Sequence, residues 1–432
     1  MLKSAGFCIL FVFNWFPSSA PAQVRAIVPA GSGELLRLSR QQAIDEALAR
    51  NYGLIAAREQ VEEARAQVVV AAAFPDPSFA ADVTGVAHPL NPRSASGNDQ
   101  GVAVTVPFPG KIGLRRAVAT ADLRAAELTL TQLRQQVASQ AAQAYDAVLV
   151  AERHRDDLRT SKEYAEDFLK KTQARFMAGT VPKVDVVKAQ VDVSQAENDL
   201  IANERATATA RALLNRLLGR LGGAPLELTD SLGIPSSLAA AESLEKLAES
   251  SRPELQSLVA QLEGAKAATR LAGRFWAPDI SLSLTRNAAQ GSPSEFTSGI
   301  SFGVPILFWQ HQRGEVAAAR HREAELTANI NDLRAQISLD VQTAFANASI
   351  ALRQAIFIRD QLLPEAREVY RIASASYGLG GSSALDLLDA KRTLLDAERQ
   401  YADALGAAND AEAALELAIG TSLPKTNPGD HS

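Results

Sequence analysis

Two stretches of this chain share one pattern: 176–189, FMAGTVPKVDVVKA, and 377–390, YGLGGSSALDLLDA. In both, a glycine is followed six positions later by an aspartate and ten positions later by an alanine, and the second copy lies 201 positions after the first. Other landmarks, such as Pro77 and Pro278, recur at the same spacing. A solenoid repeat has about 20–50 residues, so this period is too long for one. The chain is therefore a duplicated half, a form of internal symmetry common among membrane transport proteins.

Residues 1–22 have the features of a secretory signal peptide. The charge of Lys3 precedes an apolar run, Phe7–Phe13, and residues 20–22 form a small-residue cleavage site. The alternative is a buried N-terminal helix. Cys8, in that run, is the only cysteine, and the rest of the chain has no basic stretch typical of nucleic-acid binding. It also has no apolar run of about 18 residues that could form a membrane-spanning helix. We therefore expect an exported protein that binds no nucleic acid: periplasmic, secreted, or held in the outer membrane by β-strands.

Both halves predict the same order of elements: helix, strand, strand, long helix, turn, long helix. The strands alternate apolar residues with polar or small ones. Between Gly113 and Met177 there is no further glycine and no proline, which leaves enough residues for a helix of about 100 Å. We expect a first repeat at 39–218, with strands at 78–88 and 101–108 and a helical hairpin at 113–218. A linker at 219–241 leads to a second repeat at 242–422, with strands at 279–286 and 296–306 and a helical hairpin at 314–420. We expect the tail at 423–432 to be disordered.

Capping residues and prolines suggest where individual helices begin and end. Ser39 is suited to cap one helix over Gln41–Ala73, which Pro75 then stops. In the second half, Pro253 either breaks the first helix or marks its true first turn, and Pro364 interrupts the long helix.

Four strands of about ten residues are long enough to cross a bilayer. They cannot close a barrel by themselves, and an open edge in lipid would leave backbone groups unpaired. If the strands lie in the membrane, the chain must therefore assemble with copies of itself. From the residues alone, the alternative is a soluble four-stranded sheet that caps a helical bundle.

With these features together, the chain resembles the TolC-like outer membrane factors over about residues 39–422. The resemblance rests on the duplication, on the shared Gly-x5-Asp-x3-Ala pattern, and on the proline that opens each first strand. It implies a mainly α-helical fold with a β-barrel part: a homotrimer with one 12-stranded outer-membrane barrel, continued by a periplasmic barrel of helices. It also implies a periplasmic adaptor, an inner-membrane RND-type pump and outer-membrane lipid as partners.

Two further stretches resemble the heavy-metal-exporting branch of that family, which is typified by cobalt–zinc–cadmium systems. One is PFPGK at 107–111, and the other is VPILF at 304–308. The branch often has Asn-Gln-Gly shortly after the second stretch, where this chain has Gln312-Arg313-Gly314 after an additional Trp309-Gln310-His311. The resemblance favours heavy-metal cations as the exported solute, with drugs or polypeptides of type I secretion as alternatives.

The repeated glycines lie where long helices reverse direction. Glycine allows the positive φ of a helix end, and proline suits the first turn of the helix that follows. Asp185 and Asp386 lie close to a helix N-terminus, where a carboxylate is favourable. A helix-terminal role alone is therefore one interpretation of both aspartates.

The resemblance adds a second interpretation, in which these turns form the periplasmic tip where the adaptor docks and the tunnel narrows. It implies docking turns at Gly179, Pro182, Gly380 and Gly381, and a gate or constriction at Asp185, Tyr377, Asp386 and Asp389. In this gate Asp185 would hydrogen-bond Tyr377, and Asp386 with Asp389 would form an acidic constriction. The family often has an arginine two residues after the second-half glycine, and this chain has Ser382 there.

The sequence shows no pattern of a catalytic or metal site. The five histidines have no ligand spacing, and Met177 is the only methionine after the start residue. Gly110-Lys111 lacks the upstream glycine of a phosphate loop, and no nucleophile–base pattern stands out. We expect no enzyme, no cofactor and no metal site, but a passive outer-membrane exit duct whose partners supply the energy. The alternative from another class is a periplasmic coiled-coil scaffold or adaptor.

Four basic residues follow the ends of the second strands. Lys111, Arg115 and Arg116 do so in the first half, and Arg313 in the second. We expect them to lie near the periplasmic face of the membrane, where strands pass into helices.

Overall fold

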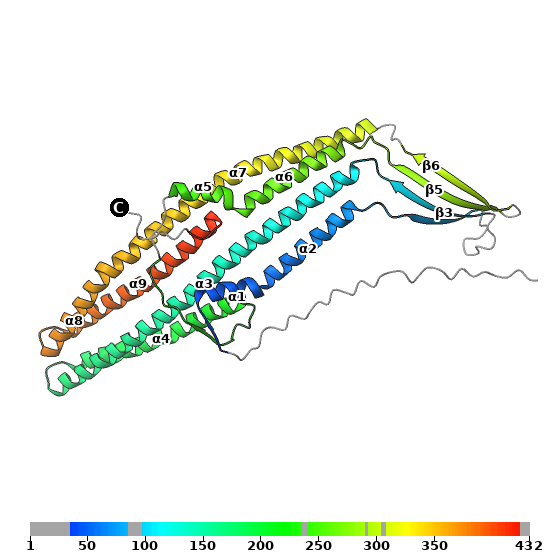
Figure 1. The fold of residues 1–432 in the computed structure, drawn as a ribbon. Coiled ribbons are helices and arrows are strands. Elements are labelled where there is room, and N and C mark those ends of the chain that lie inside the picture. The colour runs from blue at the N-terminus through cyan, green and yellow to red at the C-terminus, as the bar shows by residue number, and fades with distance from the viewer. Residues whose placement is uncertain (1–34, 85–96, 236–240, 290–292, 304–307, 424–432) are drawn as a thin grey trace, which may run out of the picture.

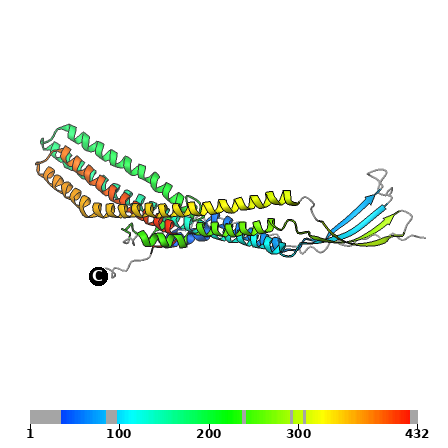
Figure 2. The ribbon, with the colours of Figure 1, turned by 90° about the horizontal axis from the view of Figure 1, so that it is seen from above.

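The computed structural model describes residues 35–84, 97–235, 241–289, 293–303 and 308–423. It is an elongated molecule with a sheet at one end and the tips of two helical hairpins at the other, as the two views agree (Figure 1 and Figure 2). The predicted signal peptide, the end of the first strand at 85–88, the end of the fourth strand at 304–306 and the tail from 424 lie outside the described residues.

The two halves contain equivalent elements in the same order. The first half has β1 (Leu36–Leu38), α1 (Arg40–Arg50), α2 (Tyr52–Ala72), β2 (Ser78–Thr84), β3 (Gly97–Val106), α3 (Lys111–Met177) and α4 (Lys183–Leu217). The second has β4 (Leu226–Leu228), α5 (Ala241–Ser251), α6 (Pro253–Ala272), β5 (Ile280–Ala289), β6 (Glu295–Phe302), α7 (Phe308–Phe357), a π-helical turn (Ile358–Leu362), α8 (Leu363–Leu379) and α9 (Ala384–Ile419).

The first helix of each half is broken at the equivalent place. Ser39 caps α1 in a reciprocal capping box with Gln42. The single helix predicted at 41–73 is wrong at Asn51, which has an extended backbone and whose side chain accepts hydrogen bonds from the first backbone N–H groups of α2. In the second half, Arg252 is extended and Pro253 is the first residue of α6. Pro253 therefore marks a helix start, as its missing N–H favours.

The long helices differ between the halves. Helix α3 has 67 residues without interruption, a length of about 100 Å, and begins at Lys111, just after Gly110, whose φ is 86°. In the second half the π-helical turn separates α7 from α8, because Pro364 cannot donate the helical hydrogen bond four residues back.

The sheet is antiparallel, with the strand order β2-β3-β5-β6. Each strand continues into or follows a helix, and the helices pack in the matching order α2-α3-α6-α7. Strand β3 begins at Gly97 and β5 ends at Ala289, so both are longer than the strands predicted at 101–108 and 279–286. The additional residues pair in register, Gly97 with Ala289. Strands β2 and β6 are the two open edges of the sheet.

The two faces of the sheet have different chemistry. Residues directly opposite one another on neighbouring strands share a face. Exposed apolar side chains occupy one face, namely Phe79, Val102, Ile280, Leu282, Leu284, Phe296, Ile300 and Phe302. The other face has rows of small and polar residues, such as Gly101–Thr285–Thr297, and one row that holds Asp82, Asp99, Asn287 and Glu295. This alternation is what a strand with lipid on one side and water on the other requires.

The halves are joined near the middle of the rod. Strand β1 pairs in parallel with β4, a contact that the sequence did not predict. Tyr145 of α3 is fully buried beneath it and donates from its hydroxyl to the Leu38 carbonyl at 3.0 Å. Within the described residues, no helix is long and apolar enough to cross a membrane.

Candidate gate at the hairpin tips

The two hairpin turns have the same backbone geometry. After α3, Gly179 has φ 73°, and the N–H of Thr180 donates to the Arg175 carbonyl at 2.9 Å. After α8, Gly380 has φ 84°, and the N–H of Gly381 donates to the Ser376 carbonyl at 2.9 Å. Both are αL helix ends at which an L side chain would be strained. Pro182 lies one residue before α4, as its N-cap.

Asp386 stabilises the start of α9. Its carboxylate accepts from the Ser383 N–H at 3.0 Å and from the Ser383 hydroxyl at 2.8 Å, in a capping box. The hydrogen bonds from the Ser383 backbone and hydroxyl lower the pKa of Asp386. Asp389 lies three residues further along α9, and both carboxylates are exposed. Residues at this spacing share one face of a helix.

The structure does not form the hydrogen bond predicted between Asp185 and Tyr377. The Tyr377 hydroxyl shares a hydrogen bond with the Thr172 hydroxyl at 2.9 Å, and both side chains are buried. The Asp185 carboxylate lies 3.8 Å from the ammonium of Lys188, on its own helix. The prediction fails within this chain because the tyrosine points at the last turns of α3 and not at the start of α4.

Arg175 is the second partner of Tyr377, and the sequence did not predict this contact. Its Nη1 donates to the Tyr377 carbonyl at 2.9 Å, and its guanidinium carbon lies 4.6 Å from the centroid of the Tyr377 ring. The ring of Phe168 meets that of Tyr377 edge-on at 5.4 Å. These contacts join the tip of the first hairpin to the tip of the second. The sequence offered one related signal, the absence of the arginine that the family often has after Gly380, where this chain has Ser382.

A buried ion pair joins the hairpins again, further from the tip. Lys391 of α9 donates to the carboxylate of Asp192 on α4 at 2.6 Å. The side chain of Lys391 is 6% exposed and that of Asp192 is 21% exposed. The pair lies in a cleft that α3, α4 and α9 line.

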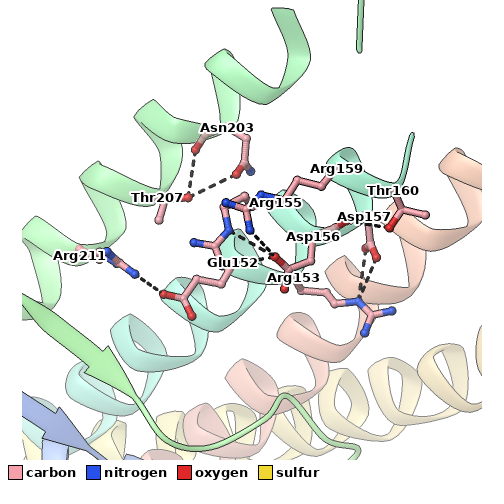
Figure 3. A network of polar contacts seen from close by, with 10 residues as sticks. All are labelled: Glu152, Arg153, Arg155, Asp156, Asp157, Arg159, Thr160, Asn203, Thr207 and Arg211. Atoms are coloured by element: carbon pink, nitrogen blue, oxygen red, sulfur yellow. Dashed lines mark hydrogen bonds and ion pairs between the residues drawn. The ribbon is translucent and has the colours of Figure 1, made fainter. Parts of the chain in front are cut away.

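A charged segment of α3, which contributes Asp157 to the lining of this cleft, faces α4 (Figure 3). Glu152 pairs with Arg211 of α4 at 2.6 Å, and Arg153 pairs with Asp157 at 3.2 Å. Burial raises the pKa of Asp157. It also raises the pKa of Glu398 on α9, with a further contribution from the charge of Asp157. One carboxylate oxygen of Glu398 is buried without a hydrogen-bond partner.

The other residues singled out from the sequence have structural roles or lie on the surface. Lys111 donates to the Ala277 carbonyl at 2.7 Å and to Asp279 at 2.9 Å, so it ties the start of α3 to the segment before β5. The side chain of His311 is 62% exposed. Among the described residues there is no group of three or more histidine, cysteine, aspartate or glutamate side chains that could hold a metal ion.

Known proteins share this duplicated architecture. The family model described as "Outer membrane efflux protein" matches the chain twice, at residues 43–220 and 244–421. The chain belongs to the outer membrane efflux protein family. This confirms the resemblance inferred from the sequence and places the protein in the outer membrane, with its helices in the periplasm. Members of the family are transport ducts.

A metal-resistance protein and two solved channel structures are similar to this efflux protein. The cobalt-zinc-cadmium resistance protein CzcC of Cupriavidus metallidurans is 24% identical over 387 residues, which cover 89% of this chain and 90% of the relative. Among solved structures, CusC has a TM-score of 0.74 at 19% identity and covers 89% of this chain and 92% of its own. The open state of the MtrE channel of Neisseria gonorrhoeae has a TM-score of 0.74 at 20% identity and covers 89% and 90%. The structures share the fold with this chain.

Proposed function

We propose that this efflux protein is a passive exit duct for heavy-metal cations, the outer-membrane component of a tripartite system. The observation that carries the choice of cargo is the likeness to a cobalt-zinc-cadmium resistance protein along nearly the whole length of both chains. The polar face of the sheet supports it, because the row with Asp82, Asp99 and Glu295 would give a water-filled lumen a cation-attracting wall. The duct performs no chemistry, so the energy comes from its partners.

The assembly that we propose is a homotrimer. One chain supplies four strands with two open edges, β2 and β6, and an apolar outer face. Edges in lipid must be paired, and transmembrane barrels have eight strands or more. Three chains joined edge to edge give a 12-stranded barrel, and the helices below would form the wall of a tunnel in the same order.

The hairpin tips are where we place the adaptor, with an RND-type pump behind it. Large apolar side chains are exposed on or beside both turns: Met177 at 83%, Leu379 at 91% and Leu385 at 69%. The turns at Gly179, Pro182, Gly380 and Gly381 present them. Exposed apolar side chains that gather on one surface mark a site of interaction with a partner.

The gate that we propose is at the same tips. Asp386 and Asp389 would form acidic rings around the narrow end of the tunnel, and Tyr377 would hold the hairpins in the resting position. In this chain the tyrosine is held by Thr172 and Arg175, so Asp185 is assigned to the start of α4. Release of these contacts would let the second hairpin move outward.

Metal retention in cells tests the cargo. In cells that express a proton-driven metal pump and its adaptor but lack the duct, we expect this chain to lower the retained cobalt, zinc and cadmium. Export of a dye or of a type I secreted polypeptide, with metal retention unchanged, would show one of the alternative ducts. Extraction from membranes without detergent would instead favour the periplasmic scaffold.

A further inference from the structure

Both tryptophans outside the predicted signal peptide lie where strands pass into helices. Trp276 lies between α6 and β5, and Trp309 is in the first turn of α7. They are 50% and 44% exposed. The ring of Trp276 lies 6.1 Å from that of Phe108, between β3 and α3, and the neighbouring Phe275 is 38% exposed. We call Phe108, Phe275, Trp276 and Trp309 the junction belt.

The junction belt continues the apolar face of the sheet. The last apolar row before the helices is Val106–Ile280–Phe302, in register across three strands. Ile280 is four residues beyond Trp276, so the belt lies at the end of the surface that faces lipid. Amphipathic aromatic rings concentrate at this level of a membrane, where one side of the ring meets acyl chains and the other meets head groups.

The charge at this junction is mainly positive. The segments 108–116, 274–279 and 309–315 have five cations, Lys111, Arg115, Arg116, Arg274 and Arg313, and two carboxylates, Asp279 and Glu315. Asp76, after α2, adds one exposed carboxylate. Lys111 pairs with Asp279 at 2.9 Å, and the charge of Arg115 also helps to lower the pKa of that carboxyl. Arg115, Arg116 and Arg313 are exposed. Each chain therefore has exposed arginines beside the aromatic belt and few carboxylates to offset them.

We propose that the junction belt and these arginines form a binding surface for anionic phospholipid in the periplasmic leaflet of the outer membrane. The tryptophans would lie at the depth of the head groups and acyl carbonyls, and the arginines would contact the phosphates. The proposal uses the outer-membrane location and does not depend on the exported solute. It would fix the height of the duct in the membrane, and with it the distance that the tips reach into the periplasm.

Tryptophan fluorescence tests the depth directly. The folded protein, with Trp15→Phe as a precaution, would be placed in vesicles whose phosphatidylcholine is brominated near the carbonyl end or near the methyl end of its acyl chains. We expect stronger quenching by bromine near the carbonyl end. Trp276→Phe and Trp309→Phe, made singly, would assign the signal. Emission unchanged by either lipid, as for tryptophans that face the lumen, would overturn the proposal, and so would quenching strongest at the methyl end.

Lipid preference tests the arginines. In vesicles of phosphatidylcholine with a minor share of labelled phosphatidylglycerol, energy transfer from the tryptophans would report anionic lipid near the junction. Changing Arg115, Arg116 and Arg313 to Gln should lower that enrichment about twofold or more. The matched control changes Arg134, Arg205 and Arg392 to Gln, since these exposed arginines lie on the helices away from the junction. Equal losses in both variants would mean that net charge alone attracts the lipid, which would contradict a site at the belt.

Discussion

Arg175 of the first hairpin binds Tyr377 of the second in two ways. Its Nη1 donates to the tyrosine carbonyl at 2.9 Å, and its guanidinium lies 4.6 Å from the centroid of the tyrosine ring. One side chain thus holds both the backbone and the ring of the residue three positions before the Gly380 turn. The contact is made inside one chain, so each chain would carry its own latch.

We expect removal of this latch to open the resting channel. Arg175→Ala with Tyr377→Phe removes one hydrogen bond to the carbonyl, one to Thr172 and the cation–π contact, each worth about 0.5–1.5 kcal/mol. Three chains multiply the effect, so single-channel conductance in planar bilayers should rise. Arg205→Ala, an exposed arginine on α4, is the control. Conductance equal to that of the parent would place the constriction elsewhere.

Asp185→Ala tests whether Asp185 holds Tyr377, as the family resemblance implies, or whether Thr172 and Arg175 hold it, as in the structure. Asp185 lies near Lys188 and does not contact Tyr377 in the chain. We therefore expect Asp185→Ala alone to change the conductance much less than the change at Arg175 and Tyr377. A rise as large as that of the double variant would restore Asp185 to the latch, through a contact between neighbouring chains.

Asp389 should control block by divalent cations. Its carboxylate is exposed, whereas that of Asp386 also completes the capping box with Ser383 at the start of α9. Asp389→Ala should therefore weaken block without loosening the helix start, and addition of Asp386→Ala should weaken block further, at a cost of about 1 kcal/mol in local stability. Asp396→Ala, on the same helix, should leave block unchanged. Block that survives loss of both aspartates would reduce them to helix-terminal residues.

The ion pair between Lys391 and Asp192 should be costly to break on one side only. Lys391→Met leaves the carboxylate in the cleft without its partner. Because the Asp192 side chain is 21% exposed, water offsets part of the cost of a fully buried charge, and we expect a loss of about 1–3 kcal/mol. Lys391→Met with Asp192→Leu removes both charges and should recover much of it. Thermal unfolding followed by circular dichroism would compare them. A double variant no better than the single one would show that the pair supplies packing and little electrostatic energy.

The stability of the helical part should rise on mild acidification because of Glu398. Its pKa is raised in the folded chain, chiefly by burial and then by Asp157. The ionised form therefore destabilises the fold above that raised pKa, and this cost disappears as pH falls toward the value of an unfolded glutamate, about 4.3. Glu398→Gln should raise the unfolding midpoint by a few degrees at neutral pH and change little near that lower limit.

A matched substitution separates burial from charge in that experiment. Glu163 is exposed on α3, so Glu163→Gln should leave the midpoint close to that of the parent at both pH values. A midpoint lowered at neutral pH by Glu398→Gln would contradict the expected sign and would show that the carboxylate is well paired.

Patterns local in sequence predicted much of this fold. The absence of proline and glycine in 114–177 predicted the long α3, and alternation predicted four strands. The break at Asn51 was missed because its cap competes with a helical pattern that continues on both sides. The π-helical turn was not predicted. Pro364 indicates that the helix is interrupted, but it does not indicate whether the interruption is a kink, a break or a π-helical turn.

Contacts between the hairpins could not be predicted from sequence. Thr172 and Arg175 on α3 meet Tyr377 on α8 because both helices pack against α9, which sets the rotation of each. A shift of one residue along α8 would point the tyrosine elsewhere. The pairing of β1 with β4 likewise depends on how the two halves approach each other. The sequence predicted that Asp185 and Asp386 lie at helix starts. A gating role could not be predicted in the same way, because it depends on how copies of the chain meet around one axis.

In the proposed trimer, β2 of one chain pairs with β6 of the next, and disulfide trapping in the outer membrane tests this pairing. The only natural cysteine is Cys8 in the predicted signal peptide, so introduced thiols have no background. Ala80→Cys on β2 would be combined in turn with Thr297→Cys, Gly299→Cys or Ser301→Cys on β6. The positive control is Gly101→Cys with Thr285→Cys, because these two residues are Cα partners on neighbouring strands of one sheet. We predict that at least one edge pair gives linked dimers and trimers on oxidation. Monomers at every edge pair, with the control pair linked, would contradict the account.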